Sequence, residues 1–311
     1  MNKIHNNLLK CLITLFFLIE FFIDSELLIN TIFKTINIFI YNLFPSIFIF
    51  FTITDILNNY HFPLYVSRIL GNIISKIFFI PKESSYIIIM SLFSGFPGNS
   101  KLIKDGLDNK IIDIYDANKI LTMTHFSNPL FIIYTIGITF FKDHKIGIII
   151  LISHYLTNYI VGLLFRNIYP KNLIKKDNKS NNQLDLISLL KKSFYNTTKL
   201  LINILGIIIF FAIITTTLSK YLNLNSFSNT ILTGLIEITT GLKYLSILNI
   251  SKIKAAILAT FFISFGGFSI HMQTMSILNK YDINYYIYLI ARIIHAALSA
   301  LIVYIILINY Y

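Results

Sequence analysis

The chain alternates long apolar runs with short polar breaks, and the length of each run indicates how it relates to a bilayer. A helix needs about 20 apolar residues to cross the hydrocarbon core. Five runs are close to this length or longer, at residues 8–23, 27–57, 146–165, 200–218 and 285–310. The pattern therefore predicts a chain built mostly of membrane-embedded helices.

The first apolar run could be mistaken for a signal peptide, because Lys3 lies before it and Lys10 lies near its start. No small-residue cleavage site follows the run, as a removable signal would require. We therefore expect residues 1–26 to form a retained N-terminal membrane segment.

Proline divides the second run. The residue before a proline is disfavoured in helical geometry, and proline itself suits the first turn of a helix. We expect one helix to end near Phe44 and a second to run from Pro45 to Asn58, followed by a third from about Pro63 to Phe79.

Several later apolar segments are too short to span a bilayer and are separated by Gly, Pro and Asn. Such half-length segments indicate re-entrant or broken helices. In the first half they are residues 86–93 and 129–140. In the second half they are residues 230–248, which Glu237 and Gly241 interrupt, and residues 253–265. The latter run ends at Gly266 and Gly267, and a further helix is expected from about Ser269.

Residues 166–199 form the one long polar stretch. Its basic residues outnumber its acidic ones: Arg166, Lys171, Lys175, Lys176, Lys179, Lys191, Lys192 and Lys199 stand against Asp177 and Asp185. The positive-inside rule places such a stretch in the cytoplasm. We interpret it as a solvated connector between a first half, residues 27–165, and a second, residues 200–311.

The two halves resemble each other. Residues 42–51 are similar to 203–211 with Pro45 opposite Gly206, residues 69–71 parallel 232–234, and residues 90–98 parallel 260–267. Paired interruptions at corresponding places in two halves point to a transport site. Packing is the alternative reading, because Gly and Ser allow membrane helices to approach closely.

Composition supports the membrane interpretation. The chain is 55% hydrophobic and 13% charged, against about 25% charged residues in soluble domains. Its mean hydropathy is +0.71. The expected fold is an all-α integral membrane bundle with two related halves and broken or re-entrant helices.

The net charge of +12 is spread between apolar segments, which suits loops that rest on an anionic leaflet. No basic helix interleaved with aromatics indicates nucleic-acid binding. The single Cys11 excludes an intramolecular disulfide and a Cys-based zinc site.

One motif is typical of an anion site. In Ser94-Gly-Phe-Pro-Gly-Asn-Ser-Lys101, a helix is expected to end at Gly95 and another to begin near Pro97 to Asn99, exposing backbone N–H groups and the positive end of a dipole. Lys101 adds a charge useful beside an anion. Ser127-Asn128-Pro129 indicates a second capped break.

The second half adds polar groups within apolar surroundings. Glu237 at membrane depth could bind a cation, a proton or a substrate group, or form a structural hydrogen bond between helices. His271 and Gln273 follow the Gly266-Gly267 break and could bind substrate or, for the histidine, titrate. The candidate substrate-binding residues are Ser94, Gly95, Pro97, Gly98, Asn99, Lys101, Ser127, Asn128, Pro129, Glu237, Thr240, Gly241, Ser264, Gly266, Gly267, Ser269, His271 and Gln273.

Enzyme signatures are missing from the sequence. We find no P-loop, GxSxG, HExxH or dinucleotide fingerprint, and we expect neither an enzyme nor a cofactor or metal. Asp105, Asp108, Asp113 and Asp116 lie in a stretch that also holds several lysines, so the simplest interpretation is a solvated face.

Four motifs resemble those of one family in the same order. Ser94 to Leu102 is similar to the SGYPxGAKL pattern of the YlbJ (SpoVV) family of sporulation integral membrane proteins, and Asn128 to Phe131 resembles its (S/N/G)-P-L-F. Glu237 to Gly241 resembles its E-x-T-x-G, and Phe265 to Gln273 its FGGxSxHxQ. The resemblance covers roughly residues 27–305.

The resemblance implies a nucleoside-recognition or Gate-domain fold in each half, similar to concentrative nucleoside transporters. It also implies transport, because YlbJ-like proteins are associated with moving dipicolinic acid across the outer forespore membrane of a sporulating bacterium. The sequence departs from the pattern at Asn99-Ser100, where the family has a small pair such as Gly-Ala.

The leading hypothesis is thus a multi-pass bacterial membrane protein that acts as a permease for a small organic anion, with lipid as its surroundings. A nucleoside or ion transporter on the same scaffold is the alternative, although a metal is disfavoured by the lack of a Cys/His ligand cluster. A third hypothesis is a non-transporting component that docks another sporulation membrane protein. A homo-oligomer is compatible with all three hypotheses.

Overall fold

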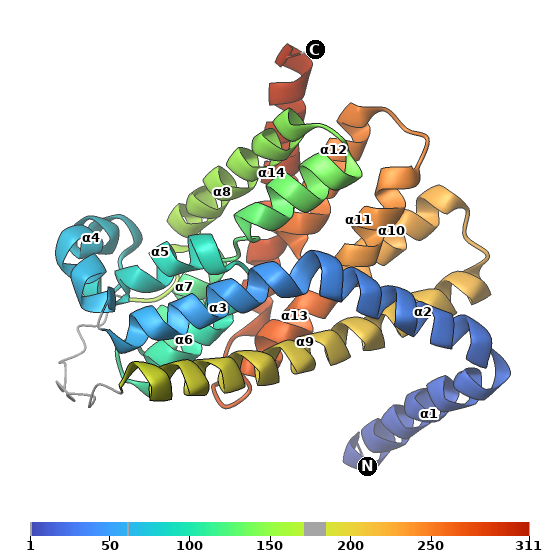
Figure 1. The fold of residues 1–311 in the computed structure, drawn as a ribbon, viewed down its shortest axis with the longest axis horizontal. Coiled ribbons are helices and arrows are strands. Elements are labelled where there is room, and N and C mark those ends of the chain that lie inside the picture. Colours follow the sequence, from blue (N-terminus) through green and yellow to red (C-terminus); the bar gives the residue numbers. More distant parts are fainter. Residues whose placement is uncertain (1, 61, 171–184, 311) are drawn as a thin grey trace.

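A computed structural model describes residues 2–60, 62–170 and 185–310, and this part of the chain is helical with no strand. The α-helices are α1 (Asn2–Ile23), α2 (Ser25–Ile38), α3 (Phe44–Asn59), α4 (Phe62–Phe78), α5 (Ser85–Ser94), α6 (Gly98–Asp108), α7 (Ile114–Met123), α8 (His144–Phe165), α9 (Leu186–Leu222), α10 (Ser226–Ile236), α11 (Ile238–Ile247), α12 (Lys252–Phe265), α13 (Gly267–Ile277) and α14 (Tyr285–Tyr310). Two π-helices, η1 (Phe39–Leu43) and η3 (Phe131–Phe140), and one 3-10 turn, η2 (Lys82–Ser84), complete the described elements. Figure 1 shows their arrangement.

Several helices are long and apolar enough to cross a membrane. In the described chain there are four, namely α8, α9, α12 with α13, and α14, or six if each of two bent pairs is one span. The bent pairs are residues 25–59, which turn by 51°, and residues 62–94, which turn by 111°. The expected all-α polytopic membrane architecture is confirmed, as is the division of the second apolar run near Pro45.

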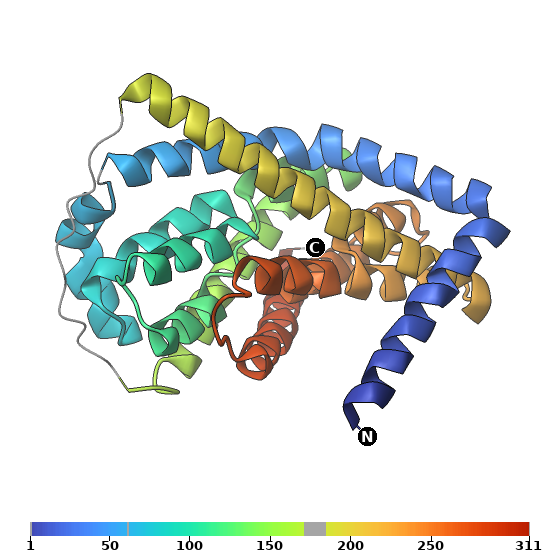
Figure 2. The ribbon, with the colours of Figure 1, turned by 90° about the horizontal axis from the view of Figure 1, so that it is seen from below.

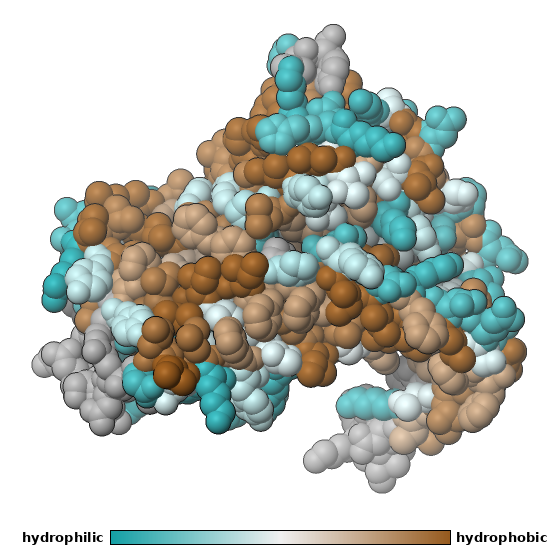
Figure 3. Space-filling view, in the orientation of Figure 1, coloured by the Kyte–Doolittle hydropathy of each residue, from teal (hydrophilic) through white to brown (hydrophobic). Residues whose placement is uncertain are grey.

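The surface agrees with a lipid environment. Large apolar side chains on the spanning helices face outward, for example Leu164 on α8, Ile202 on α9 and Ile305 on α14, each at least half exposed. Figure 3 shows hydrophobic residues over a broad area of one face. In water such a surface would be unfavourable, whereas lipid accommodates it without cost.

The helix α9 begins earlier than the sequence pattern predicts. It starts at Leu186, because Asp185 caps it by accepting a hydrogen bond from the Ser188 N–H at 3.2 Å, and it continues for 37 residues. Residues 186–199 are therefore helix and not connector, which corrects that part of the predicted 166–199 linker. Residues 171–184, with Lys171, Lys175, Lys176, Asp177 and Lys179, lie outside the described residues.

Figures 1 and 2 show α9 and the α2–α3 pair running side by side across the bundle. Their contact buries a cluster that includes Phe39, Phe51 and Ile204. The same figures show α1 projecting away from the bundle. Glu20 ties the end of α1 to α9, accepting hydrogen bonds from Lys220 and Tyr221 at 2.7 Å each.

The helix α1 is not among the described helices that meet the length and composition criteria for a span. Retention of residues 1–26 as a membrane segment stays a prediction.

Both halves follow one order of elements. A hairpin of two short helices comes first, then a broken helix, then a long helix: α5–α6, α7–η3 and α8 in the first half, and α10–α11, α12–α13 and α14 in the second. This order pairs the break after Ser94 with the break at Glu237, and the break after Met123 with that at Gly266. The sequence comparison instead matched residues 90–98 with 260–267, because apolar helices of similar composition align in more than one register.

The hairpin in the second half is held by a direct contact between two glycines. A Cβ on Gly241 would lie 2.3 Å from the Cα of Gly234, and a Cβ on Gly234 would lie 2.4 Å from the Phe262 ring. The backbones of α10 and α11 therefore touch, which only glycine permits. By contrast, nothing lies within 4 Å of a Cβ on Gly206 in α9.

The acidic stretch at residues 105–116 differs from the solvated face that the sequence predicts. Asp116 is fully buried and lies 3.4 Å from the Lys119 Nζ, which is also buried and donates to the Phe79 carbonyl at 2.7 Å. Asp113 caps α7 by accepting from the Asp116 N–H. Burial, joined by repulsion from Asp113, raises the pKa of Asp116 to about 6.

Asp105 and Asp108 on α6 differ in the direction in which the fold shifts their carboxyl pKa. Burial raises the pKa of Asp105 to about 6, with Lys101 acting in the opposite direction. Asp108 is exposed, and hydrogen bonds from Lys104 and Tyr281 lower its pKa. The charged form of Asp105 is thus disfavoured in the fold, and that of Asp108 is favoured.

We predict that Gly241→Ala destabilises the protein by about 2 kcal/mol or more, because the methyl group must displace backbone. Gly206→Ala, its matched control, should be neutral or stabilising by up to about 1 kcal/mol through helix propensity. Thermal unfolding of the purified variants in detergent measures both. Equal stability of the two variants would contradict the contact between α10 and α11.

We predict opposite pH dependence for Asp105→Asn and Asp108→Asn. Because the pKa of Asp105 is raised in the fold, its stabilising protonated form is lost as the pH rises from about 4 to about 6. Asp105→Asn should therefore match the wild type near pH 4 and exceed it by about 2 kcal/mol at pH 7.

Asp108→Asn should show the reverse, losing stability at pH 7 and little below the ordinary carboxyl pKa, since the pKa of Asp108 is lowered. Unfolding temperatures across the pH range measure both effects. The same pH trend in the two variants would refute the assignment.

Candidate functional site

Four interruptions of the helices meet inside the bundle, two from each half. They lie between α5 and α6, between α7 and η3, at Glu237 between α10 and α11, and at Gly266 between α12 and α13. Hydrocarbon offers no hydrogen bonds, so the backbone groups released at these breaks need partners within the protein. The following contacts show that the breaks supply partners to one another.

The two breaks of the first half are joined through backbone. The Phe96 N–H donates to the Phe126 carbonyl at 2.7 Å, and the Asn128 side-chain amide donates to the Phe93 carbonyl at 3.3 Å. Gly95 has φ +66°, and a Cβ there would lie 2.5 Å from the Asn128 nitrogen. Glycine at this position is required both by the backbone conformation and by the close approach.

The breaks of the second half connect to these. A Cβ on Gly266, which has φ +89°, would lie 2.6 Å from His125 Nε2, next to the break after α7. A Cβ on Gly267 would lie 3.2 Å from the Ile236 carbonyl at the end of α10. The four breaks thus form one continuous contact through the centre of the bundle.

The helix ends that the sequence predicts at Ser94 and Phe265 are confirmed, because α5 ends at Ser94 and α12 ends at Phe265.

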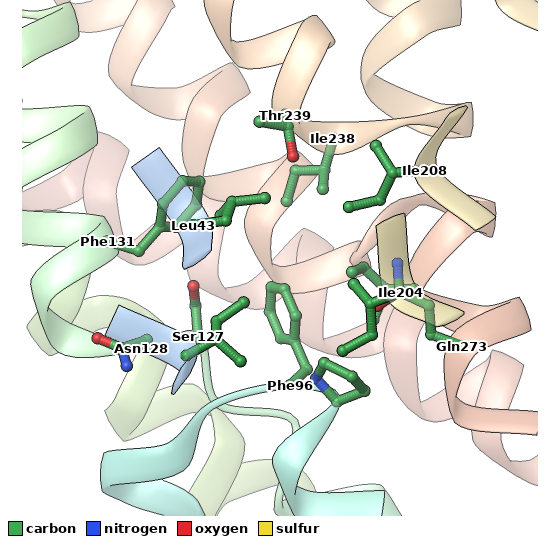
Figure 4. A pocket seen from close by; sticks show the side chains of 13 residues that line it. Leu43, Phe96, Ser127, Asn128, Phe131, Ile204, Ile208, Ile238, Thr239 and Gln273 are labelled. Carbon is green, nitrogen blue, oxygen red and sulfur yellow. The ribbon is translucent and has the colours of Figure 1, made fainter. Parts of the chain in front are cut away.

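A small cavity of about 30 Å³ lies among the breaks (Figure 4). Its polar lining comes from both halves and its remaining walls are apolar. The lining consists of Leu43, Ile47, Phe96, Pro97, Ser127, Asn128, Phe131, Ile204, Ile208, Ile238, Thr239, Ile270 and Gln273. Four predicted residues, Pro97, Ser127, Asn128 and Gln273, are therefore brought together.

Some polar atoms of the cavity lining and of the neighbouring helix starts have no partner among the described residues. Both amide atoms of Gln273 and the Ser127 hydroxyl are buried without a hydrogen bond, as are the Asn99 amide nitrogen and the Ser269 hydroxyl. Buried polar groups are nearly always paired, so such a concentration calls for an explanation. Binding of a polar ligand is one that fits their position.

Lys101 lies elsewhere. It pairs with Asp55 on α3 and its Nζ is 6.0 Å from the centre of the Phe51 ring, and it is not among the residues that line the cavity. The start of α6 is also engaged: the Asn99 N–H donates to the Gly95 carbonyl at 3.2 Å and the Ser100 N–H to the Pro97 carbonyl at 3.0 Å. The open anion site expected at this helix start is therefore largely closed by its own loop.

Glu237 has a local role. It is fully buried, and its two carboxylate oxygens accept from the N–H groups of Thr239 at 3.0 Å and Thr240 at 2.7 Å. This caps α11, whose positive dipole end favours a carboxylate. Thr239, rather than Thr240, lines the cavity, and Gly241 serves the hairpin contact.

Most of the remaining predicted residues support the breaks. Ser94 is buried at the end of α5, and a Cβ on Gly98 would lie 2.6 Å from the Phe51 ring, so the space there is already filled. Pro129 follows Asn128, whose side-chain oxygen accepts from the Leu130 N–H at 2.9 Å. His271 lies between the Phe265 carbonyl, at 3.0 Å, and the Tyr285 hydroxyl, at 3.2 Å.

A buried polar network adjoins the cavity, and of its members only Ser127 and Ser264 were expected from the sequence as site residues. His154 Nε2 accepts from the Ser127 N–H at 3.0 Å, and His154 Nδ1 lies 2.8 Å from the Ser264 hydroxyl. His295 Nε2 lies 2.9 Å from the His154 carbonyl. Ser299 donates to Ser264 at 2.8 Å. The network thus joins the breaks at residues 124–128 and 266.

Arg292 on α14 completes this network. Its guanidinium is fully buried and donates to the Thr122 carbonyl, to the Asn158 side-chain oxygen at 3.4 Å and to His295 Nδ1 at 2.9 Å. The sequence did carry a signal for it, because an ionisable residue within a long apolar run is a functional candidate. Arg292 is one of three arginines, and His295 lies three residues further along the same run.

Among the described residues there is no group of three or more His, Cys, Asp or Glu side chains placed to hold a metal ion.

Comparison with known proteins yields one informative relative. No family model and no solved structure matches the chain. The sporulation integral membrane protein YlbJ of Bacillus subtilis (strain 168) is 27% identical over 296 residues, which cover 84% of this chain and 72% of the relative. A match of this coverage extends into both halves of the chain. The chain is a multi-pass membrane protein that resembles the YlbJ family over most of its length.

Proposed function

We propose that this protein is a sporulation-related permease that carries a small organic anion across a bacterial membrane, with dipicolinate as the substrate. The observation that carries the proposal is the meeting of four helix breaks from two halves around a cavity with unpaired polar groups. Broken helices that meet between two repeats are the usual construction of a transporter site.

The polarity of the cavity suits a small ligand with an apolar body. Gln273, Ser127 and Asn128 offer polar groups, whereas the rest of the lining is mostly aliphatic and aromatic. Ligand sites in proteins commonly combine apolar walls with a few placed polar groups. A planar aromatic dicarboxylate such as dipicolinate presents both kinds of surface.

The size of the cavity bears on the transport cycle. A volume of about 30 Å³ has room for only a few water molecules, so a dicarboxylate requires the surrounding elements to separate. Movement of one half or one hairpin against the other would open it, as alternating access demands. We infer that this conformation is a closed one.

The relative supports the sporulation context by its name, sporulation integral membrane protein. A nucleoside carrier on the same scaffold is the alternative, since the Gln273 amide could equally bind a base or a ribose hydroxyl. A non-transporting membrane component is the third candidate, and it would leave the unpaired polar groups of the cavity without a role.

We predict saturable accumulation of labelled dipicolinate in proteoliposomes that contain the protein, with no inhibition by excess unlabelled nucleoside. Uptake into protein-free liposomes is the control. Uptake abolished by nucleoside would favour the nucleoside carrier, and no uptake of either compound by folded protein would favour the non-transporting component.

We predict that Gln273→Leu lowers uptake and raises stability together. Its amide should contact the anion, so kcat/KM for dipicolinate should fall roughly 10- to 100-fold. Because both amide atoms lack partners in the closed state, their removal should raise the free energy of unfolding by about 1 kcal/mol.

Met272→Leu is the matched control. Met272 is the neighbour of Gln273 on α13 and its side chain is exposed, so this substitution should change neither uptake nor stability. Uptake kinetics and thermal unfolding on the same preparations measure both effects. A stabilised Gln273→Leu protein with unchanged uptake would remove this residue from the site.

A further inference from the structure

The charge of the buried network follows from its hydrogen bonds. His154 Nε2 accepts from a backbone N–H, and His295 Nδ1 accepts from a guanidinium, so each of these rings carries its proton on the other nitrogen. That proton is donated to Ser264 by His154 and to the His154 carbonyl by His295. Both imidazoles are therefore neutral, and Arg292 supplies the positive charge of the network.

No carboxylate among the described residues forms an ion pair with Arg292. Its acceptors are two neutral oxygens and a neutral imidazole, and its Nε has no partner. The buried carboxylate at the α10–α11 break, Glu237, is engaged by the start of α11. An unpaired charge at membrane depth is expensive and normally has a ligand or a partner.

A second open group points into the same region. His125 Nδ1 lies 3.1 Å from the Tyr288 hydroxyl, whereas its Nε2 is buried without a partner. That Nε2 faces Gly266, where α13 begins with no side-chain cap. The His125 ring centre lies 6.4 Å from that of His295, which holds the guanidinium.

Phe96 separates this region from the cavity. Its ring stacks on His125 with the centres 4.7 Å apart, and the same side chain lines the cavity, as Figure 4 shows. Ser127 connects the two sides as well, because it lines the cavity while its N–H donates to His154. A shift of Phe96 would bring cavity and network into one space.

We propose that Arg292 is the cationic pole of the substrate site and binds one carboxylate of the transported anion, assisted by His125 Nε2 and the start of α13. The inference rests on the proposed function, since it names the charge by which that site recognises its substrate. A guanidinium binds a carboxylate through charge-assisted hydrogen bonds, which a neutral amide analogue cannot match. The site is thus selective for carboxylates, and Phe96 covers it in the closed state.

The test measures ligand affinity from the concentration dependence of the unfolding temperature of the full-length protein in detergent. The probes are pyridine-2,6-dicarboxylate, pyridine-2-carboxylate and the neutral pyridine-2-carboxamide. The proteins are the wild type, Arg292→Gln, Arg292→Lys and the control Arg68→Gln, which removes an exposed guanidinium on α4.

Arg292→Gln should weaken carboxylate binding at least about tenfold while leaving the weak carboxamide binding unchanged, so that the preference for the charged ligand is lost. Arg292→Lys should retain most of that preference, and Arg68→Gln all of it. A merely structural role would lower stability in Arg292→Gln without altering the ratio of the two affinities. An unaltered ratio, or no carboxylate binding by the wild type, overturns the inference.

The outcomes separate the inference from the proposed function. Binding of pyridine-2-carboxylate alone, dependent on Arg292, upholds the inference and rejects dipicolinate. If dipicolinate is taken up but Arg292→Gln keeps the preference for carboxylate over carboxamide, the permease is upheld and the inference is rejected.

If Arg292→Gln fails to fold, phenylglyoxal labelling decides in an Arg68→Lys/Arg166→Lys background, where Arg292 is the remaining arginine. Protection of Arg292 by the carboxylates but not by the carboxamide supports the inference. Equal protection, or none, refutes it.

Discussion

Backbone groups released inside a membrane protein must find hydrogen bonds within the protein, and this constraint shapes the centre of the molecule. The break at Gly95 can exist because the Phe96 N–H reaches the Phe126 carbonyl of the next break. That break in turn rests on His154 through the Ser127 N–H. Each interruption is therefore stabilised by another, and none could form in isolation in hydrocarbon.

The same constraint explains why glycines and small polar residues gather at the centre. Gly95 and Gly266 adopt positive φ and leave room for Asn128 and His125 respectively. Gly234 and Gly241 let two helices touch through their backbones. These contacts leave little free volume, so the cavity can enlarge only through movement of whole elements.

Charge is arranged differently from shape. Several ionic groups on the described helices are paired locally: Lys101 with Asp55, Lys119 with Asp116, and Lys220 with Glu20 and Asp24. Arg292 in the central network differs from these lysines, because its acceptors are neutral. Its guanidinium therefore lacks the carboxylate partner that these three lysines have.

The sequence by itself determined the membrane class, most helix bounds and the places where helices break, because apolar run length, proline and glycine act locally. It also identified Pro97, Ser127, Asn128 and Gln273 at the cavity. Only the tertiary structure decided that Lys101 pairs with Asp55 and that Glu237 caps a helix. It alone placed His125, His154 and Arg292 behind that cavity, because their neighbours come from helices far apart in the chain and local patterns carry no information about such pairings.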